Sequence, residues 1–275
     1  MGQALQPTRQ TRPLRGLIFF HCESKADLFP NMQPIRAVLF DKDGTLVDFQ
    51  RTWGPATHSV LSEISGGDSA VFDQLAAVSL YDPVQRKLLP GSPVVIETTY
   101  GYGALWAKVL GRPLTPEFVA DIDRMYFRTT LDHLTVVCDV KALMNRLVAR
   151  GYRLGLVTND ADANTRAQIQ RLGLDGQLEF IAAYDSGFGA KPDPDPVLAF
   201  AKHVGATPAE IAVVGDSVHD LAAARAAGAL AIGVLTGPNG GDGGKSLMPH
   251  ADLLLPSVVE FGDWLCAQAP VSTRP

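Results

Sequence analysis

The chain has 275 residues, enough for one large α/β domain or for a core domain with a smaller second unit. Its composition, 46% hydrophobic and 19% charged, is that of an ordinary globular protein. The formal charge of −5 gives no electrostatic footprint for nucleic acid or an anionic membrane, so we expect a small-molecule partner.

Residues 1–34 differ in composition from the rest of the chain, since Gln, Thr, Pro and Arg dominate them. The apolar run at 17–20 is too short for a signal peptide, and Glu23, Asp27 and the prolines weaken the helical face of a transit peptide. We therefore expect a disordered N-terminal extension.

The apolar run Ala37-Val38-Leu39-Phe40 shows no alternation, which indicates a strand that is covered on both faces of a parallel sheet. It is followed directly by Asp41-Lys42-Asp43-Gly44-Thr45. Two neighbouring carboxylates raise each other's proton affinity, so their presence needs a cation or a division of roles. A simple turn or helix start is the alternative interpretation of this segment alone.

From residue 48 to about residue 134 the apolar residues recur with helical spacing and no clear strand interrupts them. This block is too long for an ordinary crossover between two strands. We therefore predict an all-helical cap at 49–134, inserted into a core formed by 35–48 and 135–275. The expected cap helices span 53–64, 70–78, 102–110 and 116–129.

After the insert, helical and apolar segments alternate, which predicts a Rossmann-like, doubly wound α/β fold with a parallel sheet. The expected strands span 37–40, 153–157, 180–183, 211–214 and 229–235, with a short last strand and a helix near 253–266. The expected helices between them span 140–150, 161–172, 194–204 and 217–227.

Polar residues follow four of these strands. Thr158, Asn159 and Asp160 follow the second strand; Lys191 lies in the loop after the third; Asp216 and Asp220 follow the fourth, one helical turn apart. Each group alone is also explained by helix capping or by solvation. Because ligands bind at the carboxyl edge of such sheets, we expect these groups to meet at one site.

Together these residues form a complementary set for phosphoryl transfer. Carboxylates can hold Mg²⁺, and Lys191 and Thr158 can surround a phosphoryl group beside it. Asp41 is suited to attack phosphorus and form an aspartyl-phosphate. Asp43 can protonate the leaving oxygen and later take a proton from water.

Asp41-Lys42-Asp43-Gly44-Thr45, Thr158, Lys191 and Gly215-Asp216-x-x-x-Asp220 resemble, in this order, the four motifs of the haloacid dehalogenase-like hydrolase superfamily. The helical insert and the segment Ala222-Ala223-Ala224-Arg225-Ala226-Ala227-Gly228 are similar to its phosphoglycolate phosphatase group. The resemblance spans about residues 35–265. It implies a mobile helical cap over a Rossmann-like core.

The resemblance also implies a role for each matching residue. Asp41 would be the nucleophile and a Mg²⁺ ligand, and Asp43 the acid and base, with its main-chain carbonyl on the metal. Asp216 would bind Mg²⁺ and Asp220 support it. Thr158, Asn159 and Lys191 would bind phosphate. Lys42 replaces the apolar residue often found between the two acids, and we expect it to point away from the carboxylates.

These residues predict a Mg²⁺-dependent phosphatase acting on a small phosphorylated metabolite such as phosphoglycolate or a sugar phosphate. A phosphomutase of the β-phosphoglucomutase type would have the same motifs and is the alternative. A non-catalytic binding protein would have little use for the complete set, and a dehalogenase would not need Asp43. The sequence does not predict the substrate or the oligomeric state.

Other sequence features predict less. Cys22, Cys138 and Cys266 are far apart, which suits a reducing cytoplasm. The segment 237–246 resembles a nucleotide-binding P-loop, but Asn239 stands where its first Gly is required, so we expect a flexible loop. In the cap we expect aromatic residues to pack in the core and arginines to be solvated, although either could reach a substrate. These are Arg51, Trp53, Tyr100, Tyr102, Arg124 and Arg128.

Overall fold

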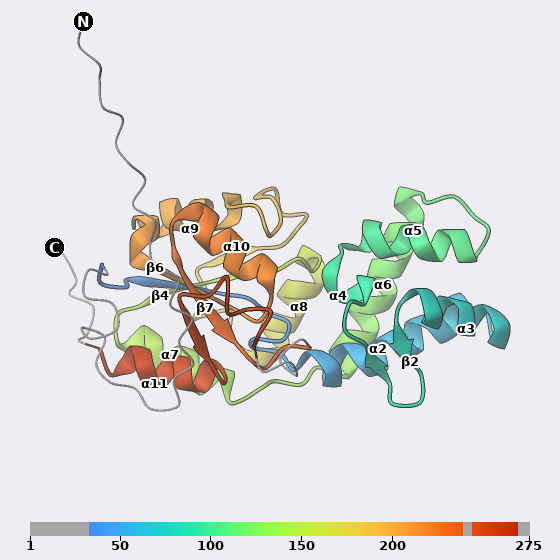
Figure 1. The fold of residues 1–275 in the computed structure, drawn as a ribbon, viewed down its shortest axis with the longest axis horizontal. Helices are drawn as coiled ribbons and strands as arrows, with labels where there is room; N and C mark the ends of the chain where they lie inside the picture. The colour runs from blue at the N-terminus through green and yellow to red at the C-terminus, as the bar shows by residue number, and fades with distance from the viewer. Residues whose placement is uncertain (1–32, 239–243, 269–275) are drawn as a thin grey trace, which may run out of the picture.

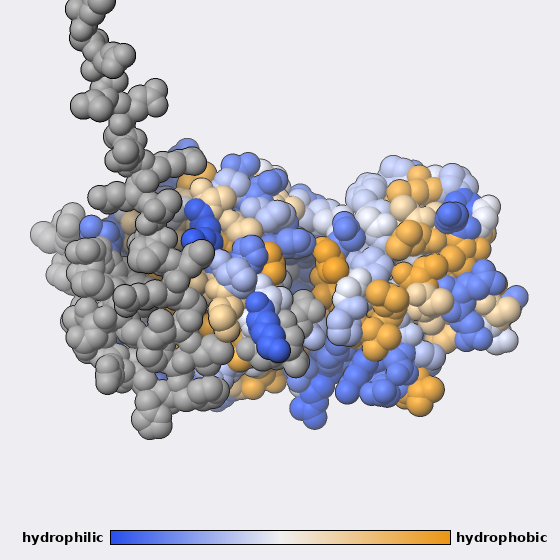
Figure 2. Space-filling model, viewed as in Figure 1, coloured by the Kyte–Doolittle hydropathy of each residue, from blue (hydrophilic) through white to orange (hydrophobic). Residues whose placement is uncertain are grey.

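A computed structural model describes residues 33–238 and 244–268. It shows an α/β core and a mainly helical lobe joined side by side (Figure 1). Figure 2 shows a constriction between the two lobes. The predicted extension at 1–34 lies outside the described residues except for its last two, and the predicted loop at 237–246 is described only in part.

The core contains a six-stranded sheet in the order β5-β4-β1-β6-β7-β8, in which every neighbouring pair is parallel. The predicted parallel sheet is therefore confirmed, with strand ends within one residue for the first five strands. The strands are β1 Ala37–Phe40, β4 Arg153–Val157, β5 Phe180–Ala182, β6 Ile211–Gly215, β7 Leu230–Val234 and β8 Leu253–Leu255.

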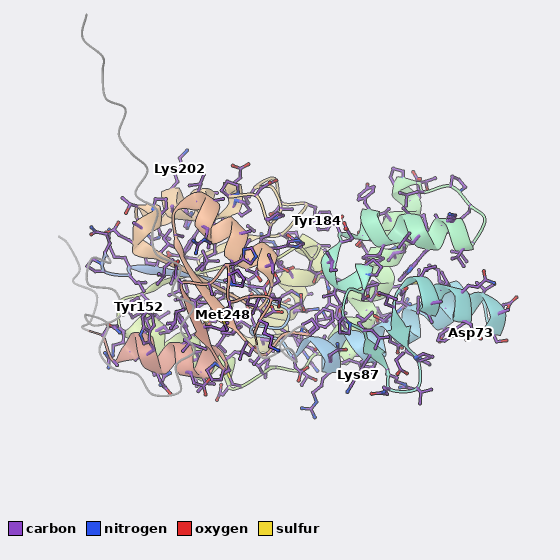
Figure 3. All side chains as sticks on the ribbon, in the orientation of Figure 1. Asp73, Lys87, Tyr152, Tyr184, Lys202 and Met248 are labelled. Carbon is purple, nitrogen blue, oxygen red and sulfur yellow. The ribbon has the colours of Figure 1, made fainter. Side chains whose placement is uncertain are left out.

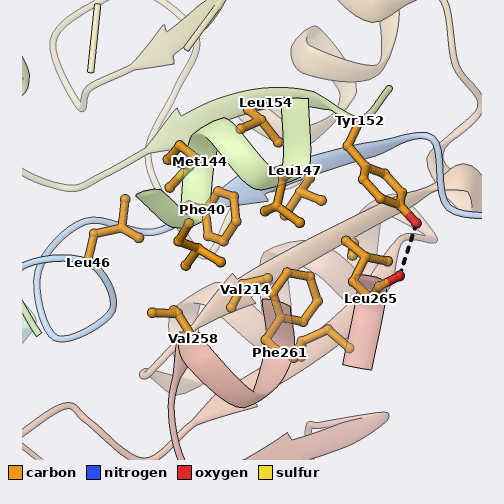
Figure 4. Close-up of a cluster of buried hydrophobic side chains, with 14 of the residues drawn as sticks. Phe40, Leu46, Met144, Leu147, Tyr152, Leu154, Val214, Val258, Phe261 and Leu265 are labelled. Atoms are coloured by element: carbon orange, nitrogen blue, oxygen red, sulfur yellow. Dashed lines mark hydrogen bonds between the residues drawn. The ribbon is translucent and has the colours of Figure 1, made fainter. Parts of the chain in front are cut away.

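Helices cover both faces of this sheet, as the predicted doubly wound fold requires. Val38 and Phe40 of β1 point into one hydrophobic cluster, with α7 and α11, whereas Ala37 and Leu39 point into another, with α9 and α10. Figure 4 shows the first cluster, which includes Phe40 and Phe261. Their rings meet edge to face, with the ring centroids 5.9 Å apart. The core helices are α7 Val140–Ala149, α8 Asp162–Leu172, α9 Asp195–Val204, α10 Val218–Ala227 and α11 Val258–Cys266.

The helical lobe has a hydrophobic cluster of its own, which includes the fully buried Trp106. The predicted helices are present, but the lobe is not all-helical, because residues 81–88 form a hairpin of two-residue strands. Such short strands leave no alternation to detect in the sequence. The elements are α2 Phe49–Ile64, α3 Ser69–Val78, β2 Tyr81–Asp82, β3 Lys87–Leu88, α4 Pro93–Ile96, α5 Thr99–Val109 and α6 Pro116–Asp132.

The two chain segments that join the lobes run side by side. The N–H of Asp48 donates to the carbonyl of Thr135 at 2.8 Å, and the N–H of Val137 donates to the carbonyl of Leu46 at 3.1 Å. We propose on this basis that 49–134 is the cap. Among the helices that the structure describes, none has both the length and the apolarity of a membrane span.

Candidate active site

The carboxyl ends of β4, β1 and β6 lie next to one another and face a cavity of about 270 Å³ between the core and the cap. All the site residues predicted from the sequence line this cavity, whichever strand they follow. They are Asp41, Asp43, Thr158, Asn159, Lys191, Asp216 and Asp220. The structure therefore brings the four motifs together, as the edge of a parallel sheet requires.

A tight loop after β1 places the two acids of the first motif. The N–H groups of Leu46 and Val47 both donate to the carbonyl of Lys42 at 2.9 Å, so the chain turns back immediately after the strand. Gly44 occupies this turn with a φ of +92°, a conformation that side chains disfavour. Asp41 therefore remains in line with β1, while Asp43 faces the cap.

Three buried carboxylates surround one buried ammonium group at the floor of the cavity. Oxygens of Asp41, Asp216 and Asp220 lie within 4.8 Å of one another. Lys191 Nζ lies 2.6 Å from Asp41 Oδ1 and 2.5 Å from Asp220 Oδ1. When all four groups are ionised, the cluster has a net charge of −2.

Two glycines leave room for the carboxylate of Asp216 in this cluster. A methyl group added to Gly44 or to Gly237 would overlap the carboxylate of Asp216. Gly237 follows β7, so a strand beyond the four motifs also shapes the site. The role of Gly237 could not be recognised from the sequence, because glycine is common in any loop.

The cluster has the properties of a site for a divalent cation. Asp41 Oδ2 is buried and has no N–H or hydroxyl donor among the described residues. Burial raises the pKa of Asp41 to about 6 despite the opposing charge of Lys191. Burial and the charges of Asp41 and Asp220 raise the pKa of Asp216 well above its ordinary value. Oxygen ligands with this excess of negative charge fit a hard divalent cation.

Metal binding should consequently depend on pH. The unfolded chain has carboxyl pKa values near 4, so between about pH 4 and 6 the folded apoprotein holds more protons at Asp41 and Asp216 and loses stability as pH rises. We expect millimolar MgCl₂ to raise the melting temperature by about 5 °C or more at pH 8 and hardly at all at pH 5. Thermal melts with MgCl₂ or with chelator test this, and an equal shift at both pH values would contradict it.

Asn159 joins the loop that carries Lys191 to the end of β4, beside Thr158. The side chain of Asn159 accepts from the backbone N–H of Lys191 at 3.0 Å and donates to its carbonyl at 2.9 Å. The hydroxyl of Thr158 accepts from the N–H of Asp160 at 3.1 Å, which leaves its own proton for a ligand. Asn159 thus brings Lys191 from the loop after β5 towards Asp41 at the end of β1.

Lys42 does not point away from both carboxylates of its motif, and that prediction is wrong for Asp43. Its fully buried Nζ lies 2.7 Å from Asp43 Oδ2, 2.8 Å from Asp160 Oδ2 and 2.6 Å from Gln168 Oε1. Adjacent side chains diverge in a strand, but the turn after Asp41 brings the side chains of Lys42 and Asp43 to one side. Burial alone lowers the pKa of Lys42, whereas Asp160 and Asp43 together raise it above its ordinary value.

Trp53 connects the cap to the second acid of the motif. Its indole N–H donates to Asp43 Oδ1 at 2.6 Å, and its ring packs against Phe49 and Tyr126. Trp53 and Tyr102 line the cavity, whereas Arg124 and Arg128 pair with Asp121 and Glu63 at exposed positions. The expectation that the aromatic residues pack in the core is therefore incomplete for Trp53 and Tyr102, which do both, and it is wrong for Tyr100, whose side chain is exposed.

A family model described as haloacid dehalogenase-like hydrolase matches residues 35–228, more than half of the chain. The chain belongs to this family. The resemblance inferred from the four motifs is thereby confirmed. A phosphoglycolate phosphatase of Rhodospirillum rubrum is 30% identical over 244 residues, which cover 87% of this chain and 94% of that protein.

Solved structures agree with the haloacid dehalogenase-like fold. A predicted phosphoglycolate phosphatase of Haemophilus somnus has a TM-score of 0.61 at 20% identity, covering 84% of this chain and 98% of that one. A putative β-phosphoglucomutase of Thermotoga maritima has a TM-score of 0.58 at 21% identity, covering 80% and 94%. At this identity they support the fold, and the chain is a hydrolase of the phosphoglycolate phosphatase-like group.

Proposed function

We propose that this hydrolase is a metal-dependent phosphatase that cleaves a small phosphomonoester through an aspartyl-phosphate on Asp41. The observation that carries the proposal is the Asp41 carboxylate itself. One of its oxygens is held by Lys191 at 2.6 Å, and the other is buried without a donor among the described residues beside Asp216 and Asp220. A carboxylate fixed in this way can attack a phosphorus atom placed above it.

In the first half of the proposed reaction, an oxygen of Asp41 forms a bond to phosphorus as the ester oxygen leaves. Asp43 gives its proton to that oxygen, so the product departs as an alcohol. Lys191, Thr158 and Asn159 are proposed to hold the phosphoryl oxygens, Asn159 through its backbone and through its hold on Lys191. A bound divalent cation would neutralise charge on the phosphoryl group.

In the second half, Asp43 takes a proton from a water molecule, whose oxygen attacks phosphorus and releases phosphate from Asp41. The carboxylates of Asp41 and Asp216 and the main-chain carbonyl of Asp43 are the proposed metal ligands, with Asp220 in support. The Asp43 carboxylate itself is held in position by Lys42 and Trp53. We propose Mg²⁺ as the resident ion.

The cytoplasmic location of the protein and the absence of nucleic-acid partners stay predictions from the sequence.

Trp53→Phe should slow the chemical step selectively. The change removes the N–H that donates to Asp43 and keeps an aromatic ring between Phe49 and Tyr126. A hydrogen bond to a charged group contributes about 1.5 to 3 kcal/mol, so we expect kcat to fall about tenfold to a hundredfold with little change in KM. Steady-state kinetics with an alkyl phosphate measure both constants.

Trp106→Phe is the matched control, because its indole donates to Ser79 at 2.8 Å inside the cap and the residue does not line the cavity. It should leave kcat nearly unchanged. Equal losses of kcat in the two variants would show that Trp53 acts only through the stability of the cap.

Release of inorganic phosphate from p-nitrophenyl phosphate and from a panel of small phosphomonoesters tests the proposed function. We expect release with Mg²⁺ and none with chelator, and parallel assays with Mn²⁺ and Ca²⁺ identify the preferred ion. Formation of an isomeric sugar phosphate without free phosphate would instead identify a phosphomutase. Absence of both reactions with every ester and ion would contradict the proposal.

A further inference from the structure

The cap side of the cavity carries negative charge, and none of the described cap residues that line it is basic. Glu97 and Asp123 line it, together with the apolar segment 94–96 and the aromatic rings of Tyr102 and Tyr126. Among the described residues that line the cavity, the only basic side chains are Lys191 and His219, and both belong to the core. A substrate bound through its phosphate at Asp41 would therefore extend towards carboxylates.

Asp123 is fixed in place by hydroxyl groups rather than by a positive charge. Its Oδ1 accepts from Thr99 at 2.6 Å, and its Oδ2 accepts from Tyr184 at 3.4 Å. Tyr184 comes from the core and lies where the core faces the cap (Figure 3). No ion pair with Asp123 is present in the described part of the chain, and burial raises the pKa of this carboxyl group.

The arginines that could offset this charge lie elsewhere. Arg124 follows Asp123 on α6, but it is exposed and pairs with Asp121. Arg128 is exposed and pairs with Glu63 on α2. Arg51 lines a different hollow, next to Gln85 and Arg86. An anionic group at the far end of a substrate would thus meet like charge without compensation.

We propose that the natural substrate is a phosphomonoester whose other end offers hydrogen-bond donors, as hydroxyl or ammonium groups, and carries no second anionic group. The inference rests on the proposed phosphatase function. Carboxylates accept such donors and repel a second carboxylate. This class excludes phosphoglycolate, the ester in the names of the relatives, and includes amino-alcohol phosphates and neutral sugar phosphates.

Four small esters with Mg²⁺ separate the possibilities: phosphoglycolate, its neutral amide, 2-hydroxyethyl phosphate and ethanolamine phosphate. A carboxylate about 6 Å from the carboxylate of the substrate in a partly hydrated pocket weakens binding about tenfold. We therefore expect kcat/KM for phosphoglycolate to be at least about tenfold below that of the best of the other three esters. Ethanolamine phosphate as the best ester would identify an ammonium group, and 2-hydroxyethyl phosphate a hydroxyl group.

Asp123→Asn should reduce the discrimination against phosphoglycolate by about fivefold to tenfold, chiefly through a lower KM for that ester. Asp121→Asn removes the same charge from the solvent side of α6 and should leave the ratios unchanged. Preference of the wild type for phosphoglycolate, or equal effects of the two variants, would overturn the inference while the phosphatase proposal stands. No release from any ester, p-nitrophenyl phosphate included, would overturn both.

Discussion

Asp41→Asn is expected to lower the turnover of p-nitrophenyl phosphate at least about a thousandfold, because the amide cannot act as the nucleophile. Lys191 and the cavity would remain, so substrate should still bind. The variant should fold, since it removes a negative charge from a cluster in which burial already raises the pKa of Asp41 to about 6. Phosphate release and a melting curve measured on the same preparation check both expectations.

Asp175→Asn is the matched control for this prediction, because Asp175 is an exposed residue after α8 and does not line the cavity. It should retain wild-type turnover. If Asp41→Asn also retained metal-dependent turnover, the covalent mechanism would be wrong.

Lys42→Met is expected to destabilise the protein by about 3 to 5 kcal/mol, since removal of one partner leaves buried charges without compensation. Lys42 is fully buried, and its ammonium group pairs with Asp43 and Asp160. Methionine has nearly the same length but no charge, so the loss would be electrostatic rather than a cavity effect. Urea denaturation followed by circular dichroism measures the free energy of unfolding.

Two further variants show whether the loss of stability comes from the buried ion pairs of Lys42. Lys202→Met, at an exposed position of α9, should change the free energy of unfolding by less than about 0.5 kcal/mol. Adding Asp160→Asn to Lys42→Met should recover part of the stability, because it removes one of the unpaired carboxylates. A loss below about 1 kcal/mol for Lys42→Met, with no recovery in the double variant, would mean that the buried pair is not maintained in solution.

The network around Lys42 also joins both ends of the cap to the core. Gln168 of α8 accepts from the ammonium group of Lys42 at 2.6 Å, and its side-chain N–H donates to the hydroxyl of Thr130 on α6 at 3.0 Å. Asp43, on the other side of Lys42, accepts from Trp53 on α2. The side chain proposed to transfer protons is therefore positioned by groups from both helices that lead into and out of the cap.

The core and the site floor could be predicted from the sequence because they depend on local patterns. Buried parallel strands are continuous apolar runs, and the polar residues that follow them meet at one edge whatever the details of the loops. This argument places Asp41, Thr158 and Asp216 without a structure. Asn159 and Lys191 were also predicted as site residues. The two hydrogen bonds by which Asn159 holds the Lys191 loop were not predicted.

Features that depend on a turn or on how the cap docks were not predictable in the same way. The direction of Lys42 follows from the turn at 41–47, and the contact of Trp53 with Asp43 follows from the angle at which α2 leaves the core. The placement of Asp123 beside the cavity depends on the packing of α6 against α8. The hairpin at 81–88 has strands too short to show a period.

Trapping of the covalent intermediate tests the central claim most directly. Asp43→Asn should let the aspartyl-phosphate accumulate from p-nitrophenyl phosphate, since the phenolate leaves without a proton but the attacking water lacks its base. Rapid quenching, reduction of the acyl phosphate with borohydride and peptide mass spectrometry locate the modified residue. We predict a metal-dependent modification at Asp41 that is absent from Asp41→Asn. Modification of any other residue would contradict the mechanism, and so would turnover of the ester without any modified residue.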